Sequence, residues 1–190
     1  MDTEKTLSPQ ESLSLIAEAI TKTKEDIKQY HFVFSLWGWL LSIASLSFFL
    51  FHKYTDLKYY FFPFPLLAAT GMITTVIWYT RRRPSQTETY GTFFLSRMWL
   101  VLAICFVTVV FINTSQNLPP FTYTMLLAGI GTLVSGMIMK FRPLIFGGIL
   151  FLCGSVASIY VDYDYKALLQ GMTYILGLLI PGYMLKYSKH

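Results

Sequence analysis

The chain has 190 residues, of which 54% are apolar and only 13% are charged, with 15 basic and 10 acidic side chains. Soluble domains carry roughly 25% charged residues, so this composition argues against a water-soluble enzyme. The net charge of +5 is scattered, and its only cluster is Arg81-Arg82-Arg83. We therefore expect no nucleic-acid partner, because such proteins concentrate basic residues on one surface.

The first 31 residues are predicted to form a cytoplasmic head. The segment Ser8-Pro9-Gln10-Glu11 is typical of a helix start, since it combines a capping serine, a first-turn proline and a glutamate that completes a capping box. Apolar residues then recur at helical spacing, which indicates an amphipathic helix reaching about Tyr30. This helix would lie on the membrane surface, pair with its own copy or dock a partner, and the first use is favoured.

Six apolar runs follow, each close to the ~20 residues that cross a bilayer as a helix. Hydrocarbon does not tolerate exposed unpaired backbone, so each run is predicted to be helical. The predicted spans are 32–51, 60–79, 93–113, 120–139, 143–161 and 167–185. Pro181 near the end of the sixth span predicts a kink. The expected fold class is therefore all-α, with residues 32–190 forming a six-helix transmembrane bundle.

The placement of lysine and arginine predicts the orientation, because cytoplasmic loops hold the excess of these residues. With the N-terminus inside, the outer loops hold only Lys53, Lys58 and Lys166, and the cytoplasmic segments hold the other 12 of the 15. We therefore expect the N-terminus and the C-terminus on the cytoplasmic side.

Small residues divide the bundle into two halves. All four tryptophans fall in the first three spans, whereas nine of the 12 glycines fall in the last three. Small residues let helix backbones approach closely in lipid. Spans four to six are thus predicted to form a tight inner bundle, with spans one to three facing lipid. The candidate helix-packing residues are Ala128, Thr132, Gly136, Gly147, Gly154 and Ser158.

Few polar groups enter the predicted spans. Arg97 lies about one turn into the third span, where snorkelling to the headgroups is the favoured interpretation. A sharper hypothesis makes it part of an anion or headgroup contact formed by Arg81, Arg82, Arg83 and Arg97. Thr132, Gln170 and Thr173 are candidates for lining a small cavity, although hydrogen bonds to a neighbouring helix are the commoner fate.

The sequence predicts no metal site, no cofactor and no catalytic residue. His31 and His52 lie at opposite ends of the first span, and the pair Asp162 and Asp164 falls short of a calcium cage. Cys105 and Cys153 lie within apolar runs and are expected to behave as small apolar residues. Motifs of hydrolases, metalloproteases and phosphate loops are missing, so catalysis is not expected, although a site built from scattered polar groups stays open.

Five short segments and the capped head carry a resemblance over nearly the whole chain. These segments are Trp37–Leu40, Gly129–Gly136, Phe141–Gly148, Asp162–Tyr165 and Ile180–Tyr183. Through them the chain resembles a family of small uncharacterised bacterial inner-membrane proteins. The resemblance implies a bacterial inner-membrane location and a six-span plan, and it implies no activity or cofactor.

Three function classes stay open on the sequence. The leading hypothesis is a non-enzymatic membrane protein that acts through helix contacts, as a homo-oligomer or as an accessory subunit of a membrane protein partner. The alternative is a small-solute or ion transporter or channel with a cavity among spans four to six. A membrane-embedded enzyme acting on lipid ranks last, because it would need Arg97 to hold an anionic headgroup.

Overall fold

The computed structural model describes residues 28–55, 59–81 and 90–188. Within these ranges the chain forms helices and the turns and connections that join them, and it forms no strand. The all-α fold class is therefore confirmed. The predicted head helix lies outside the described residues except for its last residues, from Lys28 on. Arg82 and Arg83 also lie outside them.

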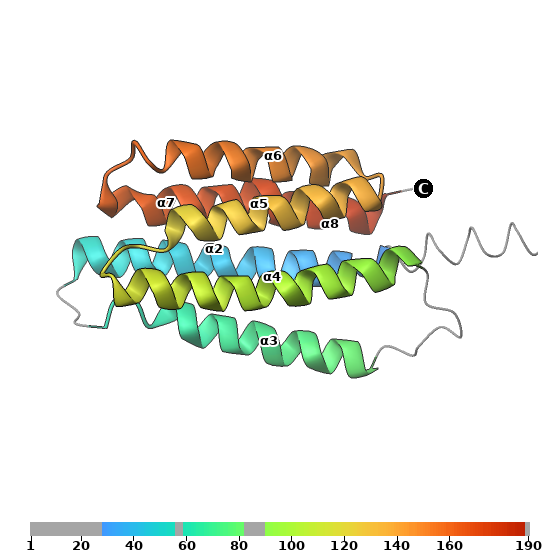
Figure 1. Ribbon diagram of the computed structural model, residues 1–190, viewed down its shortest axis with the longest axis horizontal. Coiled ribbons are helices and arrows are strands. Elements are labelled where there is room, and N and C mark those ends of the chain that lie inside the picture. Colours follow the sequence, from blue (N-terminus) through green and yellow to red (C-terminus); the bar gives the residue numbers. More distant parts are fainter. Residues whose placement is uncertain (1–27, 56–58, 82–89, 189–190) are drawn as a thin grey trace, which may run out of the picture.

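The described residues form six helical rods that lie side by side along the long axis of the molecule (Figure 1). Five rods are single helices: α2 (His31–Tyr54), α3 (Pro63–Arg81), α4 (Tyr90–Ser115), α5 (Phe121–Ile138) and α6 (Arg142–Ala157). The sixth rod is continuous but has three parts: α7 (Tyr163–Tyr174), the π-helical turn η1 (Ile175–Leu179) and α8 (Ile180–Tyr187).

Four of these rods are long and apolar enough to cross a membrane, judged by length and composition. They are His31–Tyr54, Gly91–Ser115, Phe121–Ile138 and Tyr163–Tyr187. α6 is apolar but has only 16 residues. α3 has 19 residues and falls short in hydropathy. Four such helices give the described chain the character of a membrane protein.

Prolines determine where several helices begin. Pro120 precedes α5, and Pro143 lies in the first turn of α6. α3 begins at Pro63 rather than at the predicted Tyr60, and residues 59–62 form a turn instead. Pro63 and Pro65 have no N–H to donate, so a helix accepts them only in its first turn.

Pro181 explains the π-helical turn in the last rod. It has no N–H for the Gly177 carbonyl, which would be its partner four residues back in an α-helix. The N–H of Ile180 bonds instead to the carbonyl of Ile175, five residues back. The sequence predicts a kink at this point, and the structure accommodates the proline with a wider turn.

The core of the molecule lies between α2, α5, α6 and the last rod. α5 packs closely along α6, α2 packs along α7, η1 and α8, and α3 and α4 lie at the periphery against α2 and α5 (Figure 1). The predicted assignment of the first span to the lipid-facing half is therefore wrong. The physical reason is a seam of small residues on α2 that faces the last rod, formed by Ser35, Gly38, Ser42 and Ser45.

Candidate functional site

Among the glycines of the described residues, Gly147 of α6 lies tightest against neighbouring backbone, and that neighbour is η1. A Cβ atom added at Gly147 would overlap the carbonyl oxygen of Gly177 and lie 2.9 Å from its carbonyl carbon. On the other side of the rod, a Cβ added at Gly38 would lie 2.9 Å from the Cα of Leu179. The π-helical turn is thus held between two glycines, one from α6 and one from α2.

The pair of α5 and α6 is built in the same way. A Cβ added at Gly148 would lie 2.5 Å from the backbone nitrogen of Leu133, and one added at Gly136 would lie 2.6 Å from that of Ile145. Because the opposing atoms are backbone, no side-chain rotation would relieve these contacts. Glycine is therefore required on both helices of the pair.

The six predicted helix-packing residues are all buried: Ala128, Thr132, Gly136, Gly147, Gly154 and Ser158. Gly154 faces Thr173 of α7, and the Ser158 hydroxyl lies 2.7 Å from that of Thr122. These contacts join helices of one chain. The small-residue faces are accordingly occupied inside the bundle and are not available to a partner.

The three predicted cavity-lining residues come from α5 and α7, and they are packed inside the protein. Thr132, Gln170 and Thr173 are 0%, 3% and 4% exposed. A side chain that lined a water-sized space would have accessible surface, so these residues line no such space. The Gln170 amide donates to the Thr124 hydroxyl at 3.3 Å, and the Thr173 hydroxyl donates to the Leu169 carbonyl at 2.7 Å.

A substitution of Gln170 tests whether this side chain is packed inside the protein rather than lining a cavity. Its Oε1 has no hydrogen-bond partner, and a buried unsatisfied acceptor costs about 1–3 kcal/mol. Its one interhelical bond is worth about 0.6 kcal/mol in a membrane protein. We therefore expect Gln170→Leu to leave the free energy of unfolding unchanged or to raise it by about 1 kcal/mol, measured by denaturant titration in mixed micelles.

Gln116→Leu is the matched control, because Gln116 is exposed in the connection after α4. It should change the free energy of unfolding by less than about 0.5 kcal/mol. A large loss of stability in Gln170→Leu would contradict this assignment, as would a change of solute flux across proteoliposomes.

The predicted headgroup contact is only partly described, because Arg82 and Arg83 fall outside the described residues. Arg81 ends α3 and is exposed. Arg97 is also exposed, and its guanidinium carbon lies 5.4 Å from the centre of the Phe93 ring. Phe93 is one turn closer to the start of α4, so the Arg97 side chain is directed toward that end of the bundle, as snorkelling requires.

An aromatic and charged cluster closes the opposite end of the bundle. His52 Nε2 lies 3.3 Å from the Asp164 carboxylate, and the Lys53 ammonium donates to the Tyr165 hydroxyl at 2.6 Å. The His52 ring packs 4.9 Å from the ring of Tyr60. The first two contacts join the last turn of α2 to the first turn of α7, and the third joins α2 to the turn before α3. These contacts are not predicted from the sequence, although the predicted topology places the segments on one side of the membrane.

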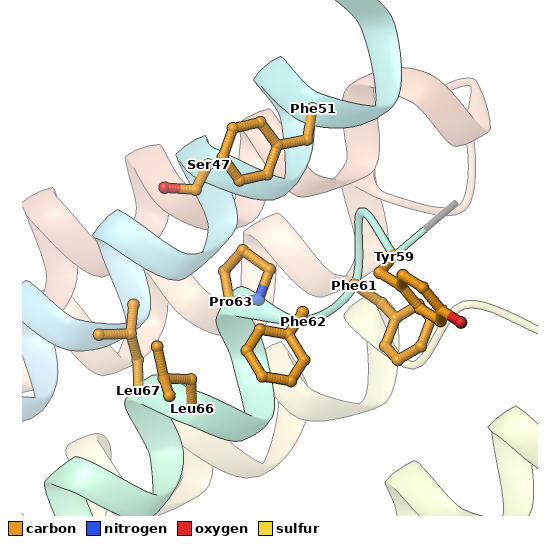
Figure 2. A pocket seen from close by; sticks show the side chains of 8 residues that line it. All are labelled: Ser47, Phe51, Tyr59, Phe61, Phe62, Pro63, Leu66 and Leu67. Atoms are coloured by element: carbon orange, nitrogen blue, oxygen red, sulfur yellow. The ribbon is translucent and has the colours of Figure 1, made fainter. Parts of the chain in front are cut away.

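A shallow apolar groove of about 810 Å³ lies beside this cluster, where α2 approaches the turn before α3 (Figure 2). Its lining is Ser47, Phe51, Tyr59, Phe61, Phe62, Pro63, Leu66 and Leu67. Only a serine hydroxyl and a tyrosine hydroxyl interrupt this lining. The groove therefore suits hydrocarbon, and none of its lining side chains is charged.

Among the described residues, no three His, Cys, Asp or Glu side chains come together as metal ligands. Cys105 and Cys153 are both free thiols, Cys105 half-buried on α4 and Cys153 exposed on α6. Comparisons of the chain with models of protein families, with curated proteins and with solved structures find no match.

Proposed function

We propose that the protein is a non-enzymatic membrane protein that acts through contacts of its peripheral helices with a second copy or with a partner subunit. The observation that supports this proposal most directly is that α4 is strongly apolar and little buried. Its apolar window has the highest mean hydropathy of the four candidate spans, 2.3, yet only 11% of that window is buried. A helix that is apolar all round and packed along one strip has most of its surface available for contact in lipid.

This proposal includes all six rods as membrane spans. At ~1.5 Å per residue, α3 is about 28 Å long and α6 about 24 Å long, against a hydrocarbon thickness of ~30 Å. A bilayer accommodates such a shortfall at modest cost. The support for α3 and α6 is their place alongside the four apolar rods (Figure 1).

Charge supports an orientation with both termini cytoplasmic. One end of the bundle, here called the basic end, carries six exposed cations among the described residues: Lys28, Arg81, Arg97, Lys140, Arg142 and Lys186. The opposite end carries Lys53 and Lys166 together with Asp162 and Asp164. The basic end faces the cytoplasm under the positive-inside rule. A bacterial inner membrane is the location that the family resemblance implies.

Cysteine crosslinking in native membranes tests the proposed contacts. In a chain with Cys105 and Cys153 replaced by alanine, we expect Val107→Cys on α4 to crosslink to a second copy or to a defined partner. Val156→Cys on α6 is the matched control, because the two valines are similarly exposed, at 59% and 57%. Only monomer from both variants would contradict the proposal, and so would equal crosslinking from both, which indicates random collision.

A further inference from the structure

The turn between α5 and α6 holds two cations in an anchored position at the basic end. Lys140 and Arg142 are exposed, whereas Phe141 between them is buried. The Phe141 N–H donates to the Gly136 carbonyl at 2.9 Å, and the Lys140 N–H donates to the Met137 carbonyl at 3.2 Å. These two bonds form a Schellman motif, which ends α5 and fixes the backbone that carries both cations.

Lys140 occupies a backbone position that favours glycine. Its φ of 52° lies in the left-handed region, where the residue after a Schellman-terminated helix is usually glycine or asparagine. A lysine at this position bears a conformational cost that glycine would avoid. An interaction of the lysine side chain that glycine would not make would offset this cost.

The described residues provide no carboxylate for that interaction. Their two carboxylates, Asp162 and Asp164, both lie at the opposite end of the bundle. The basic end also carries Arg97, whose side chain is directed toward it. Around the ends of apolar rods in a bilayer, the complementary anions are the phosphates of lipid headgroups, which accept hydrogen bonds from lysine and arginine.

We propose that the basic end, through Lys140 and Arg142, is a docking surface for the headgroups of anionic phospholipids. The inference depends on the proposed membrane arrangement and goes beyond it, because it selects one class of lipid. Each lysine or arginine near an anionic leaflet favours binding by about fivefold, and the attraction decreases with salt.

The native tryptophans provide a measurement at this end. Trp37 and Trp39 lie in the first turns of α2, Trp99 lies in the third turn of α4, and Trp78 lies near the end of α3. All four are thus nearer to the basic end. The full chain is reconstituted in phosphatidylcholine vesicles that contain either brominated phosphatidylcholine or brominated phosphatidylglycerol, and quenching of tryptophan fluorescence gives the relative binding constants.

We expect the natural chain to prefer phosphatidylglycerol by about 25-fold, about fivefold for each of Lys140 and Arg142, and Lys140→Gly/Arg142→Gln to lose most of this preference. Lys166→Gln, at the opposite end, should leave the preference unchanged. Equal quenching by both lipids in the natural chain would overturn the proposal, as would an unchanged preference in the double variant. Failure of brominated phosphatidylcholine to quench would instead overturn the membrane arrangement itself.

Lys140→Gly alone separates a lipid contact from a purely structural role. Relief of the left-handed backbone should raise the thermal unfolding midpoint in vesicles of phosphatidylcholine alone. With 30% phosphatidylglycerol added, the natural chain should gain stability and Lys140→Gly should gain less. An equal gain for both chains would overturn the proposal, because it would leave Lys140 with no role toward anionic lipid.

Discussion

Gly147→Ala is expected to lower the free energy of unfolding by about 2–3 kcal/mol, a loss as large as that expected for Trp99→Ala. The added methyl group would overlap the Gly177 carbonyl. Because this carbonyl is part of the backbone and the methyl group would be attached directly to the α6 backbone, no side-chain rotation would relieve the overlap. Since α6 and η1 are each fixed by other contacts, the two helices would have to move apart. Unfolding by denaturant in mixed micelles measures the loss.

Gly91→Ala is the matched control for this substitution. Among the described residues, a Cβ at Gly91, in the first turn of α4, would meet only the Cγ2 of Ile138 at 3.6 Å, which is an ordinary contact. Alanine favours a helix over glycine by about 0.5–1 kcal/mol, so this variant should be as stable as the natural chain or more so. Equal stability of the two variants would contradict the packing of η1 against α6.

Gly154→Ala should lie between them. Its Cβ would lie 3.1 Å from the hydroxyl oxygen of Thr173, a side-chain atom that is able to shift. We expect a loss of about 1 kcal/mol in the same unfolding measurement. A loss as large as that of Gly147→Ala would show that α6 and α7 are packed more rigidly than the contact distances indicate.

The helices themselves could be predicted because hydrocarbon leaves the backbone no other choice. Apolar runs, and the prolines that begin α5 and α6, located the rods to within a few residues. The start of α3 was placed three residues early. The reason is that Tyr60, Phe61 and Phe62 extend the apolar run, whereas the helix requires Pro63 to lie in its first turn.

The neighbours of each helix were harder to predict, because apolar content does not specify which face meets which helix. The four tryptophans suggested a lipid-facing first span. A different signal was present in the spacing of Ser35, Gly38, Ser42 and Ser45, which alternates between three and four residues. This spacing is that of a left-handed helix pair, and the structure uses it to pack α2 against the last rod.

For the candidate site, the sequence indicates which residues pack against other helices, but it does not indicate which helices they meet. The small residues that the sequence predicts as packing positions on α5 and α6 are buried, but the use of those faces depends on which chain supplies the opposing helix. Gly147 meets Gly177 through a π-helical turn that Pro181 produces, and a contact of this kind depends on backbone geometry that residue spacing does not encode.

Trp99→Ala is expected to lower the free energy of unfolding by about 2–3 kcal/mol, because Trp99 attaches α4 to the rest of the bundle. Its Nε1 donates to the Ser135 hydroxyl at 3.0 Å, and its ring fits against Gly131. α4 packs chiefly against α5. Loss of this ring would therefore weaken the main contact that holds a long apolar helix in place.

Two further variants separate the ring from its hydrogen bond. Trp99→Phe keeps an aromatic ring but removes the donor and part of the indole that faces Gly131, so it should lose about 1–2 kcal/mol, less than Trp99→Ala. Trp39→Ala removes a ring that is 48% exposed and bonded to the exposed Tyr183, and it should lose less than about 1 kcal/mol. If Trp99→Ala were no more destabilising than Trp39→Ala, the attachment of α4 would not depend on Trp99. The α4 surface proposed for contact would then have to be held in position by contacts other than this ring.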